Sequence, residues 1–312
     1  MSANMTTLGD VSDRVDAMNQ NCHDALVDVP AISFESLETM KIGDERHTLR
    51  TVAQRSIAWR LGIPYNYLAK CPVDLQAEQM NHWIKSERRS QLFVRYVSNA
   101  SNDIRAIFTP RYKPVDNFEI MERLDAMGYG PDTQVQCHLD EEFMLLSIPD
   151  GKRSFKINGD KMTPGISISN SEVGLASLSV SAFILRLVCT NGMVVKNEIS
   201  ASYRHVSTKI LSELPQVFER VADGLGKQKD RLKLSLESPV VDPLMTIGNF
   251  NRQFALGEME KSAVEWAWPQ EAGETMFNVV NTYTRAAAME GLPAESSFKL
   301  QRVGGEVLGM LR

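Results

Sequence analysis

Residues 166–181 read ISISNSEVGLASLSVS, and this stretch decides the fold class. Apolar and polar residues alternate on both sides of the segment Glu172-Val-Gly174, which is the pattern of two half-buried strands joined by a short turn. Gly174 suits the left-handed position of a three-residue hairpin loop. The stretch therefore predicts an antiparallel hairpin with one apolar face and one hydroxyl-bearing face.

The serines form the polar face of this predicted hairpin. The loop length places Ser169 opposite Ser177 and Ser167 opposite Ser179. Such a face is either plain solvent-exposed sheet or a surface for nucleic-acid backbone, because short hydroxyl groups reach phosphate oxygens without steric hindrance. Farther along the second strand both faces become apolar, and Arg186 lies there. A buried arginine must be paired or hydrogen-bonded, so Arg186 belongs either to an ion pair or to a site.

The same alternation with a period of two recurs elsewhere in the chain. Residues 92–97 and 103–108 form one predicted hairpin, and residues 133–139 and 142–148 form another. Helical periodicity marks residues 50–62, 73–85 and 115–127, and helices also dominate the chain after residue 206. We therefore expect an α+β fold in which antiparallel hairpins form a curved sheet backed by helices, with a helical C-terminal part.

Charge is distributed unevenly over the 312 residues, whose formal net charge is −5. Residues 1–49 carry nine acids and three bases, whereas residues 85–113 carry seven bases and two acids. Residues 257–295 are acidic again. These shifts predict an acidic N-terminal segment over residues 1–45, an α+β core domain over 46–238 and a helical region over 239–312. A global charge of this size does not favour general adhesion to nucleic acid, so any anion site must be local.

The basic stretch coincides with the first predicted hairpin. A five-residue loop over 98–102 places Arg95 opposite Arg105 on neighbouring strands. Two arginines directly opposite one another destabilise a sheet unless something negative lies between them. Either a nearby carboxylate or a bound phosphate would serve. Arg111, Tyr112 and Lys113 follow in the turn after the hairpin.

Several function classes have no support in the sequence. There is no P-loop, GxGxxG, GxSxG, HExxH or CxxC motif. No apolar run is long enough to span a bilayer, which predicts a protein without membrane association. The four cysteines lack a dense pairing pattern, which fits reduced thiols in a cytoplasm. We expect no metal and no nucleotide cofactor.

Five segments together resemble one family of proteins. They are Leu61-Gly-Ile-Pro64, Ile104-Arg-Ala-Ile-Phe-Thr-Pro-Arg-Tyr112, Gly165 to Gly174, Phe183 to Gly192 and Asn281-Thr-Tyr-Thr-Arg285. The chain, over roughly residues 45–312, is similar to a large uncharacterised family of phage-like and plasmid-like proteins, a domain of unknown function carried by phages, plasmids and conjugative elements. This resemblance implies a mobile-element setting in the cytoplasm of a bacterial host cell.

These observations lead to a binding protein as the first hypothesis. The order of hairpins followed by a long helix is similar to single-strand annealing recombinases, which is an analogy of fold. We expect single-stranded DNA binding and annealing in homologous recombination, by a homo-oligomer that could form a ring. The predicted binding residues are Arg95, Arg105, Arg111, Tyr112, Lys113, Ser167, Ser169, Ser177, Ser179, Arg186 and Arg204.

Two other hypotheses stay open. An enzyme acting on nucleic acid or a nucleotide would use Arg186, Arg204 and His205, and it would require these side chains to converge with a carboxylate in one pocket. A protein-binding or defence-countering module would instead use the acidic ends of the chain, for example as a mimic of DNA.

Overall fold

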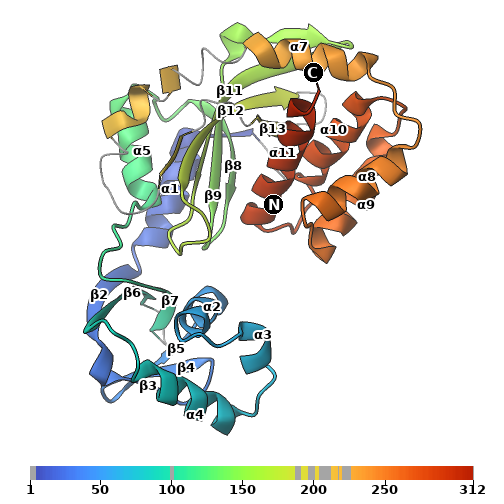
Figure 1. The fold of residues 1–312 in the computed structure, drawn as a ribbon. Helices are drawn as coiled ribbons and strands as arrows, with labels where there is room; N and C mark the ends of the chain where they lie inside the picture. Colours follow the sequence, from blue (N-terminus) through green and yellow to red (C-terminus); the bar gives the residue numbers. More distant parts are fainter. Residues whose placement is uncertain are drawn as a thin grey trace.

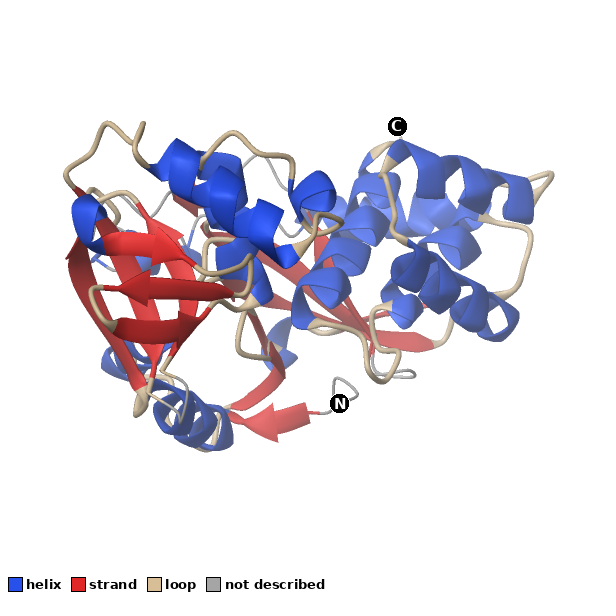
Figure 2. Ribbon diagram, turned by 90° about the horizontal axis from the view of Figure 1, so that it is seen from below, coloured by secondary structure: helices blue, strands red, loops and turns tan. Residues whose placement is uncertain are grey.

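The computed structural model describes residues 5–98, 102–186, 191–195, 201–203, 212–216, 218–219 and 226–311. They form an α+β structure in which all paired strands are antiparallel, apart from one isolated bridge, and in which helices make up the C-terminal part (Figure 1). Figure 2 shows these C-terminal helices gathered at one end of the molecule. Among the described residues, no helix is both long and apolar enough to cross a membrane. The predicted fold class is confirmed.

The larger lobe is built on an eight-stranded sheet with the order β1-β8-β9-β11-β12-β13, to which β10 adds beside β11 and β14 beside β12. Its strands are β1 (Met5–Thr7), β8 (Gln134–Leu139), β9 (Met144–Pro149), β10 (Phe155–Ile157), β11 (Asp160–Asn170), β12 (Leu178–Arg186), β13 (Asn191–Val195) and β14 (Ala201–Tyr203). The long strands β11 and β12 hold its centre, as the alternation in residues 166–181 predicts.

Helices cover both faces of this sheet (Figure 1). Helix α1 (Leu8–Asn19) packs against α5 (Asn117–Ala126), and their apolar side chains join Ile166 and Ile168 of β11 in the main core. Helix α11 (Ala294–Gly309) lies against β9 and β13 on the other side. The remaining C-terminal helices are α7 (Gly226–Glu237), α8 (Pro243–Gln253), α9 (Glu258–Glu271) and α10 (Met276–Ala286).

The smaller lobe has its own hydrophobic core, which includes Ile57, Met80 and Leu92. One three-stranded sheet has the order β2-β6-β7, and a second has the order β3-β4-β5. The strands are β2 (Cys22–Asp28), β3 (Ile32–Phe34), β4 (Thr39–Ile42), β5 (Glu45–Thr48), β6 (Gln91–Val97) and β7 (Asp103–Phe108). Helices α2 (Thr51–Arg60), α3 (Tyr65–Leu68) and α4 (Val73–Ile84) complete it.

The acidic first part of the chain contributes to both lobes. Strand β1 pairs with β8 of the large sheet, and β2 pairs with β6 of the small lobe. The boundaries at residues 45 and 238 that charge and periodicity indicate stay a prediction.

Two predicted registers are wrong, each for a local reason. In the first hairpin Val97 pairs with Asp103, but the register shifts at a bulge between Arg95 and Tyr96, so Arg95 pairs with Ala106 rather than with Arg105. In the third hairpin Ser169 pairs with Ser179 rather than with Ser177, because the connection between the strands is longer than three residues. Gly174 nevertheless has a positive φ of 87°, as the loop prediction requires.

Candidate functional site

Arg95 and Arg105 of the first hairpin are buried and paired with carboxylates. The Arg95 side chain is 2% exposed; its Nε donates to Asp24 Oδ1 at 2.9 Å and its Nη2 to Asp116 Oδ1 at 2.6 Å. Its Nη1 donates to the backbone oxygen of Glu172 at 3.0 Å. Carboxylates of the protein, and not a bound phosphate, therefore neutralise Arg95. The buried Arg95 side chain is not accessible to a phosphate.

Arg105 completes what we call the buried ionic cluster: Arg95, Arg105, Asp24, Asp116 and Glu172. Arg105 is 6% exposed, and its guanidinium pairs with the carboxylate of Glu172. The other oxygen of that carboxylate accepts a hydrogen bond from the backbone N–H of Asn117 at 2.6 Å. Since Glu172 and Asp116 belong to the large lobe and the arginines to the small lobe, the cluster fastens the two lobes together.

Burial and charge shape the ionisation of the cluster. Burial raises the pKa of the Asp116 carboxyl, and the nearby carboxylates of Glu172 and Asp24 raise it further, although Arg95 acts in the opposite direction. For Arg95, burial opposes the charged form, but Asp116 and Asp24 hold its pKa above the usual value, so it stays charged. Three carboxylates thus share two guanidinium groups, and the cluster has one negative charge in excess when all are ionised.

The predicted serine face is not an accessible surface. Ser167 and Ser169 are buried; Ser147 Oγ donates to Ser167 Oγ at 3.3 Å, and Ser169 Oγ lies 2.7 Å from Ser179 Oγ. Leu145, which lies opposite Ser169, packs against Ala294 of α11. A helix therefore covers the hydroxyl face, which the hairpin alone did not reveal. Ser177 and Ser179 are only partly exposed.

Two further predicted residues have structural roles. Arg186 pairs with Asp160 at 2.7 Å and with Glu271 at 2.7 Å, and thereby ties the start of β11 and the end of β12 to α9. Tyr112 is half-buried, and its ring stacks on Phe108 with the centroids 3.7 Å apart. Arg204 and His205 lie outside the described residues.

The outer end of the same hairpin is different, because its arginines are exposed. Arg88 and Arg89 precede β6, while Arg111 and Lys113 follow β7, and all four are exposed. A groove of about 610 Å³ runs between the two chain segments; its lining residues are Arg88, Arg89, Ser90, Gln91, Thr109, Pro110 and Arg111. None of the described acidic residues lines this groove.

A second groove, of about 390 Å³, adjoins the first. It shares Arg88, Arg89 and Thr109 with the first groove and is further lined by Trp59, Arg60, Leu61, Trp83, Ser86 and Glu87. The Trp59 side chain is 82% exposed and that of Trp83 is 48% exposed. We call Trp59, Trp83, Arg88, Arg89 and Arg111 the tryptophan-arginine surface.

Helical spacing explains why the two indoles face outward. Helix α2 buries Val52, Ala53 and Ile57 on one side, so Trp59 lies on the other side of the helix. Helix α4 buries Met80 and Ile84, so Trp83 also projects outward. Indole side chains are normally well buried, and two in adjacent exposed positions are a feature of binding surfaces.

Among the described residues, Glu87 is the one carboxylate at this surface, and it orders the neighbouring arginines. It pairs with Arg60 at 3.4 Å and with Arg89 at 3.2 Å. Burial disfavours its ionisation, yet the backbone hydrogen bond from Arg89 and the charge of Arg60 hold the pKa of Glu87 below its usual range. Within the part of the chain that the structure describes, neither Arg88 nor Arg111 forms an ion pair, so both are available to an external anion.

Trp59, Trp83, Arg88 and Arg89 are not among the site residues predicted from the sequence. Both arginines lie in the basic stretch, and the helical spacing of Trp59 relative to Val52 and Ile57 was a usable signal. Arg111 and Lys113 are the predicted site residues that the structure leaves exposed at this end of the hairpin.

Comparison with known proteins identifies part of the chain. No curated protein and no solved structure matches it. Residues 106–233, which run from β7 into α7 and include Arg111 and the central hairpin, match a family model described as a domain of unknown function (DUF932). The matched region is shorter than the one over which we noted a resemblance. Over residues 106–233 the chain is therefore similar to an uncharacterised family.

Proposed function

We propose that this protein binds single-stranded DNA through the tryptophan-arginine surface. The observation that carries the proposal is the presence of two exposed indoles beside Arg88 and Arg111, neither of which forms an ion pair among the described residues. Proteins that bind single strands without sequence preference combine a positively charged groove with aromatic side chains on which bases stack. Duplex DNA offers no free base faces, so the pairing of indoles with arginines favours a single strand.

In this proposal, one groove binds the bases and the other binds the phosphates. Trp59 and Trp83 offer π-faces to successive bases, since every base stacks on an aromatic ring. Arg88, Arg89 and Arg111 line the adjoining groove, where they hold backbone phosphates. Lys113, exposed in the same turn as Arg111, adds positive charge nearby. This mode of binding requires no metal ion and no nucleotide cofactor.

The charge distribution is consistent with a local site. The chain has a formal net charge of −5, so long-range attraction does not bring DNA to every surface of the molecule. Binding is then confined to the groove that Arg88, Arg89 and Arg111 line, to which none of the described acidic residues contributes. The buried ionic cluster supports this place from within, because Arg95 and Arg105 hold the hairpin whose outer end carries the grooves.

The wider role that we propose is DNA handling on a mobile element. Single-strand annealing during homologous recombination would take place in the cytoplasm of the bacterial host and would use a homo-oligomer that can form a ring. The resemblance to phage-like and plasmid-like proteins supports this part of the proposal. Light scattering with and without an oligonucleotide tests it: annealing predicts a large DNA-dependent oligomer, and a small species that ignores DNA would contradict it.

Binding itself is tested by fluorescence anisotropy with a fluorescein-labelled oligo(dT). We expect saturable binding that weakens as salt rises, with log K falling against log salt by roughly 0.7 per neutralised phosphate. Quenching of the tryptophan fluorescence should accompany binding, because Trp59 and Trp83 stack on bases. Duplex DNA of the same length is the control and should bind more weakly. Absence of binding at micromolar protein in low salt would refute the proposal.

A further inference from the structure

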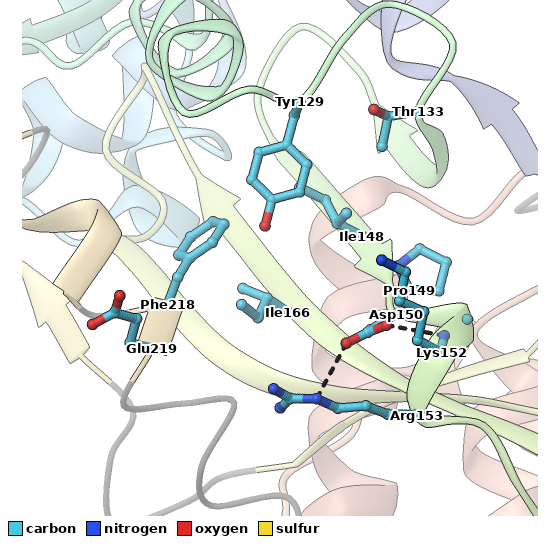
Figure 3. Close-up of a pocket in the computed structure, with 12 residues that line it drawn as sticks. Tyr129, Thr133, Ile148, Pro149, Asp150, Lys152, Arg153, Ile166, Phe218 and Glu219 are labelled. Carbon is cyan, nitrogen blue, oxygen red and sulfur yellow. Dashed lines mark hydrogen bonds and ion pairs between the residues drawn. The ribbon is translucent and has the colours of Figure 1, made fainter.

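A pocket of about 600 Å³ lies in the large lobe, away from the tryptophan-arginine surface (Figure 3). Its floor is formed by Ile148 of β9 and Ile166 of β11, next to the backbone of Gly165. Tyr129, from the connection between α5 and β8, and Phe218 form its walls. Their rings meet edge to face, with centroids 6.1 Å apart and planes at 65°.

The interior of this pocket is suited to an aromatic or similarly flat apolar group. Ile148, Ile166 and Phe218 present apolar side chains that are nearly inaccessible to solvent. Aromatic rings add a preference for edge-to-face or offset contacts with a further ring. Pockets of 300–1,000 Å³ that are mostly apolar and carry a few well-placed polar groups are typical small-molecule sites.

Hydrogen-bond donors surround this apolar interior. Tyr129 points its hydroxyl toward the centre of the pocket, and Thr133 lies at its edge (Figure 3). Neither hydroxyl has a hydrogen-bond partner among the described residues. Lys152, on the 3-10 turn Gly151–Arg153, brings an exposed ammonium group that forms no ion pair in the described part of the chain.

The acids at this pocket do not cancel that charge. Asp150 is engaged with Arg153 at 3.3 Å and also accepts a hydrogen bond from the backbone N–H of Lys152 at 3.0 Å. Glu219, the second acid, lies beside Phe218 on the opposite side from Lys152 (Figure 3). The groups left to meet a ligand on the Lys152 side are therefore donors, which favour an anionic acceptor.

We propose that this pocket binds a small aromatic anion, with the ring between Tyr129, Phe218 and the isoleucine floor and the anionic group at Lys152. The site is independent of the proposed DNA-binding surface, since the two share no residue and lie in different lobes. A carboxylate, sulfonate or phosphate ester satisfies the same donors.

The test uses 8-anilinonaphthalene-1-sulfonate as the anionic probe and N-phenyl-1-naphthylamine, which has nearly the same rings but no sulfonate, as the neutral one. We expect saturable fluorescence enhancement by the anionic probe at a single site and weaker binding of the neutral probe. Lys152→Ala should weaken the anionic probe by about tenfold or more, the size of a hydrogen bond to a charged group, and should leave the neutral probe unchanged. Lys161→Ala, which removes an exposed lysine outside the pocket, is the matched control.

Methyl NMR of isoleucine-labelled protein locates the bound probe. The proposal predicts that the Ile148 and Ile166 methyl signals shift with the same affinity as the fluorescence change. Shifts confined to other isoleucines would overturn it, as would equal binding of both probes together with no effect of Lys152→Ala. Trp59→Ala should leave probe binding intact, which separates this result from the test of DNA binding.

Discussion

The hairpin of β6 and β7 has arginines at both ends, and the two groups differ in burial and in ion pairing. At the inner end Arg95 and Arg105 are almost fully buried, and each pairs with at least one carboxylate. At the outer end Arg88 and Arg111 are exposed and have no ion-pair partner among the described residues. The same residue type, within one basic stretch of the sequence, thus holds the lobes together at one end and faces solvent at the other.

The difference arises from segments that are far away in the chain. Asp24 lies 71 residues before Arg95, and Glu172 lies 67 residues after Arg105. These acids reach the inner end of the hairpin because β2 pairs with β6 and because the connection between β11 and β12 approaches it. No comparable segment approaches the outer end among the described residues apart from the one that carries Glu87. Exposure and pairing, rather than the local charge count, separate the structural arginines from those that we propose to bind DNA.

The largest expected effect is on stability at the inner end. Arg95→Ala takes the partner away from Asp116, whose side chain is 15% exposed, and from Asp24, whose side chain is 25% exposed; breaking a buried ion pair from one side costs about 3–5 kcal/mol. Urea unfolding of the variant should show this loss of unfolding free energy. Arg88→Ala is the control, and it should leave the unfolding free energy nearly unchanged because its side chain is exposed. Equal stability of both variants would erase the distinction between the two ends.

The next effect is on DNA affinity at the outer end. Trp59→Ala removes one stacking platform, so we expect binding of oligo(dT) to weaken by about 1–3 kcal/mol in anisotropy titrations. The melting temperature of the Trp59→Ala variant should stay close to that of the parent protein, since the indole of Trp59 is 82% exposed. Trp266→Ala in α9, where the indole is 45% exposed, provides a tryptophan control in the other lobe. If both variants lose the same affinity, the surface is not where DNA binds.

A smaller effect concerns the salt dependence of binding. Arg88→Ala and Arg111→Ala each remove one phosphate contact, so each should reduce the slope of log K against log salt by roughly 0.7. Arg46→Ala removes an exposed arginine that is paired with Glu35 and lines neither groove, and it should keep the parent slope. An unchanged slope in the Arg88/Arg111 double variant would show that these side chains do not contact phosphates.

The smallest effect is at the acids of the buried ionic cluster. Because three carboxylates share two guanidinium groups, Asp116→Asn should change stability by less than about 1 kcal/mol, in contrast to Arg95→Ala. The pKa of Asp116 is raised in the folded protein, so above the ordinary value of 3.8 the folded state keeps a proton that the unfolded chain has released. The stabilisation of the folded state by protonated Asp116 therefore decreases as pH rises above 3.8.

The asparagine variant lacks this titration. Its stability relative to the parent should therefore increase as pH rises from about 4 to about 6, measured by urea unfolding at each pH. A relative decrease over the same range would mean that Arg95 stabilises the ionised Asp116 more than burial opposes it, and the sign of the pKa shift would be wrong.

The sequence supports the secondary structure and fold class better than it supports the site. Alternation in residues 166–181 predicts β11 and β12, and the position of Asp116 predicts the start of α5, where the structure has it as the N-cap. Such features depend on neighbours in the chain. The register of strand pairing depends on geometry that no short motif encodes. The bulge between Arg95 and Tyr96 and the long connection after Asn170 therefore made two predicted registers wrong.

The site residues were harder to predict for the same physical reason. A run of serines with a period of two is compatible with an exposed face or with one that a helix covers, and only the position of α11 decides between them. Arg95 and Arg105 were predicted to need an anion because they were placed opposite one another. The anions are carboxylates of the protein itself. The exposed Trp59 and Trp83 become neighbours only after α2 and α4 are folded against the hairpin.

The most direct test of the central claim is photo-cross-linking of the protein to a 5-iododeoxyuridine-substituted oligonucleotide, followed by peptide mapping. Iodouracil reacts with aromatic side chains that stack on it, so the position of the cross-link reports which surface holds the bases. We predict cross-links in the peptides that contain Trp59 or Trp83, which are lost at high salt. Cross-links confined to the C-terminal helices, such as at Trp266, would contradict the assignment of binding to the outer end of the hairpin.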